Sequence, residues 1–300
     1  MDKLEAMTRF VAVAETGSFT LAADRLNLPK SAISASVTKL EQQLQTRLFH
    51  RSTRRVTLTE AGERYLPQCL QLLNDIDHLE AQFQQQQGLI AGEIRIDMPT
   101  RFATTVVIPY LQQWYQLYPE TQLRLLSHDY RIDPIKAGID CLVRVGDLTN
   151  SDLIARPLGK IDMVNCASAE YIERHGMPQT PDELDRHWLI DYSPNVREDN
   201  LGFEYVCDAK VVLIPVASQI SVSTTEAYLS ACLHGLGIAQ LPKFSVKGYL
   251  QTGELIEILP DYPSEPMPVS ILYPSRQQLP KRVKVLMDWI ESLFKSHCSN

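Results

Sequence analysis

Short polar side chains and arginines follow one another closely between residues 30 and 55. Lys30, Ser31, Ser34, Ala35 and Thr38 share one face of a helix over this span. Short side chains let a helix approach base edges, and Ser and Thr hydroxyls can bond to either kind of base. Arginines in the following segment suit phosphates and a narrow minor groove. The candidate DNA-binding residues are Ser18, Thr20, Lys30, Ser31, Ser34, Ala35, Thr38, Arg47, Arg51, Thr53, Arg54 and Arg55.

Two short helices and a strand pair are needed to position these residues. Ser18 is a good N-cap for a helix whose apolar residues recur from Phe19 to Leu26. The run breaks at Asn27 to Pro29, because proline suits only the start of a helix. A second helix is expected from about Lys30 to Gln45, with a stripe of Ile33, Val37, Leu40 and Leu44. Alternating Val56 and Leu58 then predict a wing strand, so the stretch indicates a winged helix-turn-helix.

The run from Met7 to Gly62 resembles the N-terminal domain of LysR-type transcriptional regulators. The matching positions are Phe10, Val13, Gly17, Ser18, Phe19, Ala22, Ala23, Ser34, Leu40, Glu41, Arg47, Leu48, Phe49, Arg51, Leu58, Thr59, Ala61 and Gly62. Many members of the family carry an arginine directly after the serine that matches Ser34, and here that residue is Ala35. We therefore expect base reading to depend more on Lys30, Ser31, Ser34 and the wing arginines.

Charge is distributed unevenly along the 300 residues. Residues 1–58 contain nine basic and five acidic residues, a net charge of +4, and the remaining 242 contain 20 and 31, a net charge of −11. The length suggests about two domains, and a hydrophobic content of 44% is enough for real cores. A basic head on an acidic body points to nucleic-acid contact through the head alone.

Residues 59–88 predict a long connecting helix with a single apolar seam. Its members are Leu66, Leu70, Leu73, Ile76, Leu79 and Phe83. The family resemblance implies that this helix pairs with its twin to form a dimer. The alternative is that the seam packs on the chain's own C-terminal domain. Pro67 should bend or locally open the helix.

Residues 89–300 alternate predicted strands and helices, which is typical of an α/β body. Strands are expected at 92–98, 121–127, 140–146, 153–159, 162–168, 187–192, 238–242 and 269–274, with a hairpin at 203–215. Helices are expected at 106–119, 132–138, 169–175, 225–237 and 281–296. The resemblance implies two lobes similar to those of periplasmic solute-binding proteins. One lobe would comprise residues 89–162 and 266–300, and the other residues 163–265.

Polar residues follow several of these strands, where open α/β sheets bind ligands. The candidate effector-binding residues are Thr100, Arg101, Phe102, Ser127, His128, Asp129, Arg144, Gly146, Ser193, Asn195, Thr224 and Thr225. Arg101 and Arg144 would suit a carboxylate by bidentate pairing. Thr224 and Thr225 begin a helix, whose free amides favour an anion.

Signals for other functions are weak. The seven histidines are scattered without metal-ligand spacing, and no nucleotide-binding or serine-hydrolase motif is present. We therefore expect no enzyme activity, no metal and no cofactor. The N-terminal segment does not resemble a signal peptide, and the six cysteines form no C-x-x-C pairs, which favours reduced, buried thiols in the cytoplasm. No apolar run is long enough for a membrane span.

The predicted fold class is α/β: an N-terminal all-α winged helix-turn-helix (1–58), a linker and dimerisation helix (59–88), and a two-lobed effector-binding domain (89–300). The predicted function is a DNA-binding transcriptional regulator controlled by a small-molecule, carboxylate-type effector. Expected partners are double-stranded DNA, that effector, RNA polymerase and the chain itself, as a homodimer or homotetramer; no membrane partner is expected. Two alternatives stay open. One is a cytoplasmic solute-binding or catalytic α/β protein with an incidental helical N-terminus, and the other is a repressor that binds DNA without a ligand.

Overall fold

The computed structural model divides into two compact units, Met1–Leu89 with Asp133–Ile139, and Ile90–Ile132 with Asp140–Asn300. It describes residues 2–51, 56–84, 89–135, 137–148, 153–194, 202–274 and 279–298. The segment 133–139 groups with the first unit, whereas it was expected within the C-terminal body.

Three helices form the core of the N-terminal unit: α1 (Lys3–Thr16), α2 (Phe19–Leu26) and α3 (Lys30–Leu44). The Ser18 hydroxyl accepts the N–H of Leu21, so it caps α2, and Asn27 ends that helix in the left-handed conformation. Phe10, Ile33 and Val37 are fully buried where the helices meet. Both helices of the predicted helix-turn-helix are therefore confirmed within a residue of the expected bounds.

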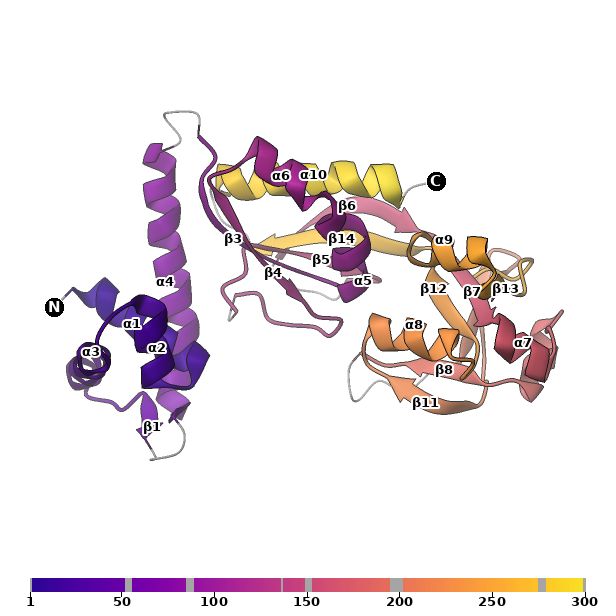
Figure 1. The fold of residues 1–300 in the computed structure, drawn as a ribbon, viewed down its shortest axis with the longest axis horizontal. Coiled ribbons are helices and arrows are strands. Elements are labelled where there is room, and N and C mark those ends of the chain that lie inside the picture. The colour runs from indigo at the N-terminus through magenta and orange to yellow at the C-terminus, as the bar shows by residue number, and fades with distance from the viewer. Residues whose placement is uncertain are drawn as a thin grey trace. The chain divides into compact units, whose positions relative to one another are not determined.

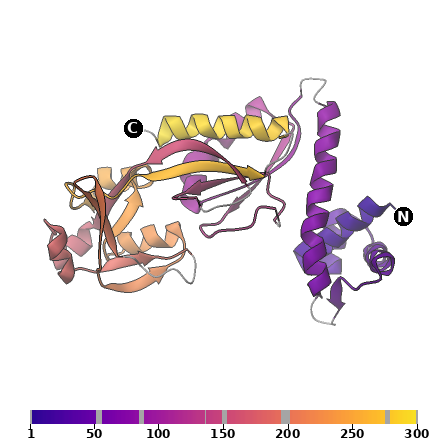
Figure 2. The ribbon, with the colours of Figure 1, turned by 180° about the vertical axis from the view of Figure 1, so that it is seen from behind.

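A small wing and a long helix complete this unit. Strands β1 (Phe49–Arg51) and β2 (Val56–Leu58) pair antiparallel, and α4 (Glu60–Gln84) follows. Helix α4 continues without interruption through Pro67, and the bend or local opening expected there stays a prediction. Figures 1 and 2 show α4 as one long helix from opposite sides.

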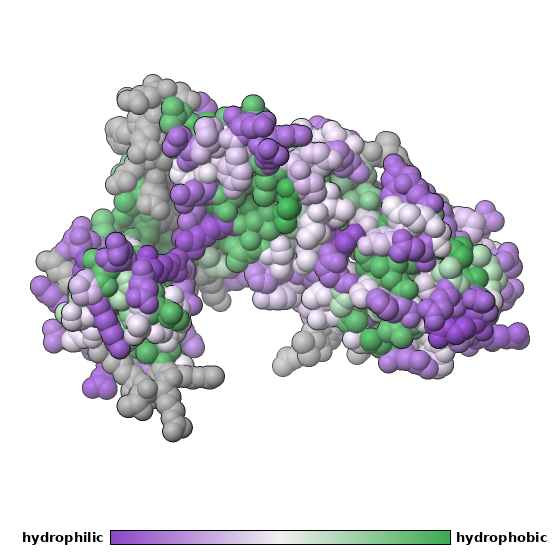
Figure 3. Space-filling model, in the orientation of Figure 1, coloured by the Kyte–Doolittle hydropathy of each residue, from purple (hydrophilic) through white to green (hydrophobic). Residues whose placement is uncertain are grey.

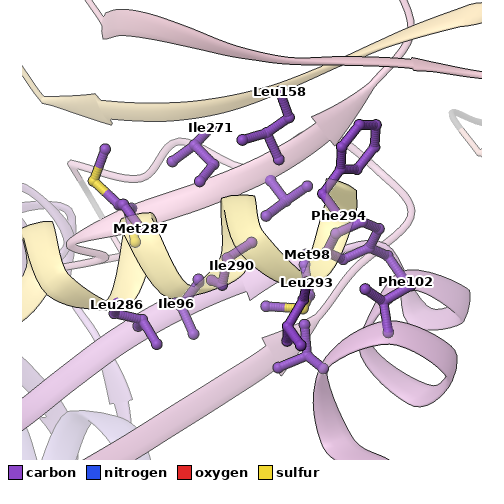
Figure 4. Close-up of a cluster of buried hydrophobic side chains, with 14 of the residues drawn as sticks. Ile96, Met98, Phe102, Leu158, Ile271, Leu286, Met287, Ile290, Leu293 and Phe294 are labelled. Carbon is purple, nitrogen blue, oxygen red and sulfur yellow. The ribbon is translucent and has the colours of Figure 1, made fainter. Parts of the chain in front are cut away.

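The second unit begins with a lobe built on a five-stranded sheet in the order β4-β3-β5-β14-β6. Its strands are β3 (Gly92–Met98), β4 (Thr121–Ser127), β5 (Cys141–Val145), β6 (Leu153–Ile161) and β14 (Met267–Pro274). Strand β3 pairs parallel with β4 and β5, and β14 pairs antiparallel with β5 and β6. Helical residues cover it as α5 (Thr100–Phe102), a π-turn, a 3-10 turn, α6 (Leu111–Leu117) and the C-terminal α10 (Lys281–His297). Figure 4 shows Leu286, Ile290 and Phe294 of α10 packed over Ile96 and Ile271 of the sheet.

The other lobe is built from smaller sheets. One sheet has three strands, β7 (Met163–Ser168), β12 (Ala239–Pro242) and β13 (Leu255–Glu257). A second sheet pairs β8 (Leu189–Tyr192) parallel with β11 (Ser218–Val222). A third pairs β9 (Phe203–Cys207) antiparallel with β10 (Lys210–Ile214). Its helices are α7 (Ala169–His175), α8 (Thr225–Leu233) and α9 (Lys243–Thr252), with a 3-10 helix at Pro181–Arg186. Strand β6 leads directly into β7, and the chain returns through β14, so two connections join the lobes (Figure 1).

Several elements differ from the sequence prediction. The helical segment expected from residue 106 begins at Thr100, because Pro99 occupies its N-cap position. Residues 134, 135, 137 and 138 form turns, so the helix predicted at 132–138 is wrong for the described residues. Strands β11 and β13 and helix α9 were not expected from the sequence.

The cysteines depart from expectation at one position. Cys69, Cys141, Cys166 and Cys232 are buried and Cys298 is half-buried, but Cys207 is exposed on β9. All six are free thiols. In the part of the chain that the structure describes, no helix is long and apolar enough to cross a membrane.

Candidate DNA and effector sites

Helix α3 presents a polar face opposite its buried stripe. Lys30, Ser31 and Ala35 are exposed, and Ser34 and Thr38 are half-buried. Ile33, Val37 and Leu40 point into the core with no exposed surface. Lys39 is also exposed, four residues after Ala35, and the sequence interpretation overlooked it although its helical spacing from Ser31 and Ala35 was visible.

Glu41 connects α3 to the wing. Its Oε1 accepts the backbone N–H of Leu48 at 2.8 Å and that of Phe49 at 3.2 Å. Thr59 holds the other side of the same segment, because its Oγ1 donates to the carbonyl of Arg47 at 2.7 Å. These contacts fix the backbone around Arg47, whose side chain is exposed.

The remaining DNA-binding candidates lie around this helix and wing. Thr20 is exposed in the first turn of α2, and the hydroxyl of Ser18 is occupied in capping that helix. Arg51 ends β1, but its side chain lies outside the described part of the chain. Thr53, Arg54 and Arg55 lie outside the described residues altogether.

The apolar seam of α4 divides into two parts. Leu70 is buried in the core of the N-terminal unit, and Leu66 and Leu73 pack against that core. The expectation that Leu70 contacts a second chain is therefore corrected, because its side chain is buried within the N-terminal unit. For Leu66 and Leu73, which are half-buried, that contact stays a prediction. Leu79 is 55% exposed, Leu72, which was not predicted, is 42% exposed, and Ile76 is half-buried. The side chain of Phe83 lies outside the described residues.

Asp129 bridges the two lobes of the second unit. Its Oδ1 accepts the N–H of Thr100 at 2.9 Å, at the start of α5. Its Oδ2 accepts the N–H of Thr225 at 2.7 Å and the Oγ1 hydroxyl of the same residue at 3.1 Å. Thr224 caps α8, because its Oγ1 accepts the N–H of Ala227. The loops predicted to line an effector site thus meet, and one carboxylate joins them.

Arg101 makes a second connection between the lobes. Its Nη1 lies 3.3 Å from the Glu226 carboxylate, and its Nη2 donates to the carbonyl of Ser245 at 2.6 Å. Its Nε is buried and has no hydrogen-bond partner among the described residues. Glu226 and Ser245 were missed because only the fold brings them to Arg101.

Asp97 is a fully buried carboxylate at the end of β3. His128 Nδ1 lies 2.7 Å from its Oδ1, and Arg144 Nη2 lies 2.7 Å from its Oδ2. The Arg144 guanidinium also donates to the carbonyl of Val143. Two of the predicted effector residues are therefore paired with a carboxylate of the chain itself, which the sequence analysis did not select.

Two tyrosines of the other lobe stack on each other, and one of them senses the charge of Asp129. The rings of Tyr192 and Tyr228 stack with centroids 5.3 Å apart. Burial raises the pKa of Tyr192, and the negative charge of Asp129 raises it further. Ser193 follows Tyr192 and donates its N–H to the carbonyl of Val222, whereas Asn195 lies outside the described residues.

Other effector candidates take different places. Phe102 is only 2% exposed and belongs to the core of the five-stranded lobe, so its proposed contact with an effector is corrected (Figure 4). Ser127 is exposed at the end of β4. Gly146 has a φ of +94°, a conformation that favours glycine, directly after β5.

Family models match both units of the chain. The model described as a bacterial regulatory helix-turn-helix protein of the lysR family matches residues 4–63, and the LysR substrate binding domain matches residues 87–295. The first match favours DNA binding over the interpretation that the N-terminal helices are incidental.

Relatives and solved structures extend over nearly the whole chain. The HTH-type transcriptional regulator YhjC of Escherichia coli is 41% identical, covering 99% of each chain, and the HTH-type transcriptional activator AaeR of the same species is 35% identical over 98% of this chain and 94% of its own. The full-length virulence activator AphB of Vibrio cholerae superposes with a TM-score of 0.63 at 28% identity, covering 97% of this chain and 99% of its own. CrgA, a LysR-type transcriptional regulator from Neisseria meningitidis, gives 0.62 at 30% identity, covering 96% and 97%.

Proposed function

The chain belongs to the LysR-type transcriptional regulators, and on that premise we propose which of its residues contact DNA, bind the effector and mediate self-association. The family assignment makes it a DNA-binding transcriptional regulator with an effector-binding domain. We place DNA contact on α3 and the wing, effector contact between the lobes, and self-association on α4.

The exposed face of α3 supports the assignment of the DNA contact. Lys30, Ser31, Ala35 and Lys39 lie on that face and would enter the major groove, where Ser34 and Thr38 can also reach base edges. Arg47 and the wing arginines would contact phosphates. The observation that carries this proposal is that one carboxylate oxygen of Glu41 accepts the backbone N–H groups of both Leu48 and Phe49, because these bonds fix the wing relative to α3.

The effector site is proposed where Thr100 and Thr225 approach one carboxylate. Backbone N–H groups at helix starts favour anions, so a small-molecule carboxylate is the class that suits these donors. Arg101 adds a guanidinium with one unpartnered N–H in the described part of the chain. An effector acts by binding one arrangement of the lobes better than another, since equal affinity for both would shift nothing.

Self-association is proposed through the part of α4 that its own head leaves uncovered. Leu72, Ile76 and Leu79 would pack against the same residues of a second chain, and the dimer would present two heads to a site with two-fold symmetry. Figure 3 shows hydrophobic residues gathered on the visible face around β3 and β4, and β4 is an edge strand of the five-stranded sheet. Such a surface suits the second contact that a homotetramer needs. RNA polymerase remains a proposed partner, and the cytoplasm the proposed place of action.

Fluorescence anisotropy with fragments of the genome selected by the protein tests the DNA assignment. We expect affinity to fall as salt rises from 50 to 200 mM, by roughly 10³-fold or more if about six phosphates are contacted. Competition by unrelated duplex DNA separates specific from non-specific binding. Failure to select any fragment above that competitor would overturn the proposed function.

A further inference from the structure

One carboxylate of the chain already occupies the donors that an anionic effector would use. Asp129 lies in the loop after β4, outside both α5 and α8, yet its two oxygens accept the N–H groups of Thr100 and Thr225. The first begins the helical run of one lobe, and the second begins α8 in the other. The N–H groups at a helix start have no partner within the helix and carry partial positive charge, so each favours an anion.

The surrounding contacts show that this carboxylate is part of a connection between lobes. Arg101 reaches Glu226 and the carbonyl of Ser245, and Thr104 donates to Glu226 at 3.3 Å. The charge of Asp129 also acts on Tyr192, whose pKa it helps to raise. One donor of this connection is left over among the described residues, the buried Nε of Arg101.

We propose that Asp129 is an internal latch: its carboxylate holds the two lobes in the arrangement of this structure, and an effector's carboxylate acts by displacing it from Thr100 and Thr225. The proposal rests on the proposed effector site and adds how that site is regulated. Displacement breaks the hydrogen bonds by which Asp129 joins the lobes, so effector binding and the arrangement of the lobes are coupled through one side chain.

The latch also restricts the class of effector. A tethered carboxylate has an effective concentration in the millimolar range or above, so a free carboxylate with no other contact competes poorly. An effector must therefore add interactions that Asp129 lacks. Acetate, which offers the carboxylate alone, should enter the site only when Asp129 is removed.

Hydrogen exchange of the full-length Asp129→Ala variant with and without sodium acetate tests the latch. The amides of Thr100 and Thr225 should exchange about tenfold faster or more than in the wild type, because each loses a bond to a charged acceptor. Acetate should slow both amides again in a saturable manner, relative to sodium chloride at the same ionic strength. The wild type should show no such protection by acetate.

Two further variants serve as controls. Asp182→Ala removes an exposed carboxylate from the first turn of the 3-10 helix Pro181–Arg186 and should leave exchange at Thr100 and Thr225 unchanged. Asp129→Asn keeps the size of the side chain but has only one acceptor oxygen, so at least one of the two amides should lose protection. This second variant carries the test if Asp129→Ala does not fold.

Unchanged exchange at both amides in the Asp129 variants would overturn the latch. The latch would also be overturned if acetate did not slow exchange in Asp129→Ala, or if acetate slowed exchange equally in the wild type and in that variant. Anisotropy with selected DNA on the same samples separates this outcome from failure of the proposed function. Loss of acetate rescue with intact DNA binding rejects the latch alone, whereas acetate rescue without any DNA binding supports the latch and rejects the DNA assignment.

Discussion

Gly62 and Leu48 approach so closely that a Cβ atom on Gly62 would overlap the carbonyl oxygen of Leu48. That carbonyl also accepts the N–H of Thr59 at 2.9 Å, so it has little freedom to move aside. The first turn of α4 therefore presses directly against the backbone that enters the wing. Only a residue without a side chain allows this approach.

Gly62→Ala should lower the free energy of unfolding of the N-terminal unit by about 1–3 kcal/mol, because the added methyl group forces the backbone of Leu48 to shift. Gly248→Ala is the matched control, since a Cβ there meets nothing within 4 Å on α9. That control should be neutral or stabilising by about 0.5–1 kcal/mol, because alanine favours a helix. Urea denaturation of both variants measures the difference, and equal stability would contradict the close contact.

Glu41→Ala should weaken both folding and DNA binding. It leaves the N–H groups of Leu48 and Phe49 without their acceptor in a partly buried place, which costs about 1–3 kcal/mol. Glu41→Gln keeps an acceptor oxygen, so it should lose clearly less stability and less DNA affinity than Glu41→Ala. Denaturation and operator anisotropy on both variants check this order; an alanine variant as stable as the glutamine variant would show that the contact does not position the wing.

Local signals in the sequence predicted the head well. Ser18 and Pro29 mark helix starts by chemistry that acts over a few residues, and the buried stripe of α3 follows directly from its spacing. The strands of the five-stranded sheet were also recognisable from alternation or apolar runs. In contrast, β11 and α9 were missed: β11 is short and mostly exposed, and α9 carries a central glycine that is unfavourable in a helix.

Contacts between residues far apart in the sequence account for the other differences between the sequence prediction and the structure. Asp129 was selected as a residue that touches an effector, but its partners are 29 and 96 residues away, so its role as a bridge appears only in the fold. The spacing of Leu70 and Leu79 on one seam likewise could not tell which leucine meets the head and which stays exposed. Asp97 was overlooked because an alternating strand does not reveal that two basic side chains converge on it.

Leu79→Asp should shift the protein toward monomers, because it places a charge on the exposed part of the α4 seam. Leu213→Asp changes another exposed leucine, 44% accessible on β10, and should leave the oligomeric state unchanged. Leu70→Ala should instead destabilise the head by about 2–5 kcal/mol, since that side chain is buried there. Sedimentation velocity over a range of concentrations distinguishes the three, and a Leu79→Asp protein that associates like the wild type would reject α4 as the interface.

Stability should decline at alkaline pH in a manner that depends on Cys69. Burial raises the pKa of its thiol from 9.0 to about 11, so the unfolded chain loses this proton at a lower pH than the folded chain does. The thiol's contribution is therefore fully present below pH 9 and is lost between pH 9 and about 11. Cys69→Ala should remove roughly 2–3 kcal/mol of that decline, whereas Cys207→Ala, at an exposed position, should leave it unchanged. Denaturation curves at several pH values would contradict the prediction if the two variants behaved alike.

Lys30→Ala should reduce DNA affinity and also its dependence on salt. Lys30 is exposed in the first turn of α3, where an ammonium group can reach a phosphate or a base edge beside the groove. Loss of one phosphate contact lowers the slope of log K against log salt by about 0.9, because one fewer counterion is released. A contact with a base edge would instead leave that slope nearly unchanged and relax specificity at one position by about 1–3 kcal/mol.

Lys247→Ala is the matched control, since Lys247 is exposed on α9 in the other unit and should alter neither quantity. Anisotropy titrations at four or more salt concentrations, on a selected site and on single-base variants of it, separate the two roles, and an unchanged affinity for all of them would show that this helix is wrongly placed.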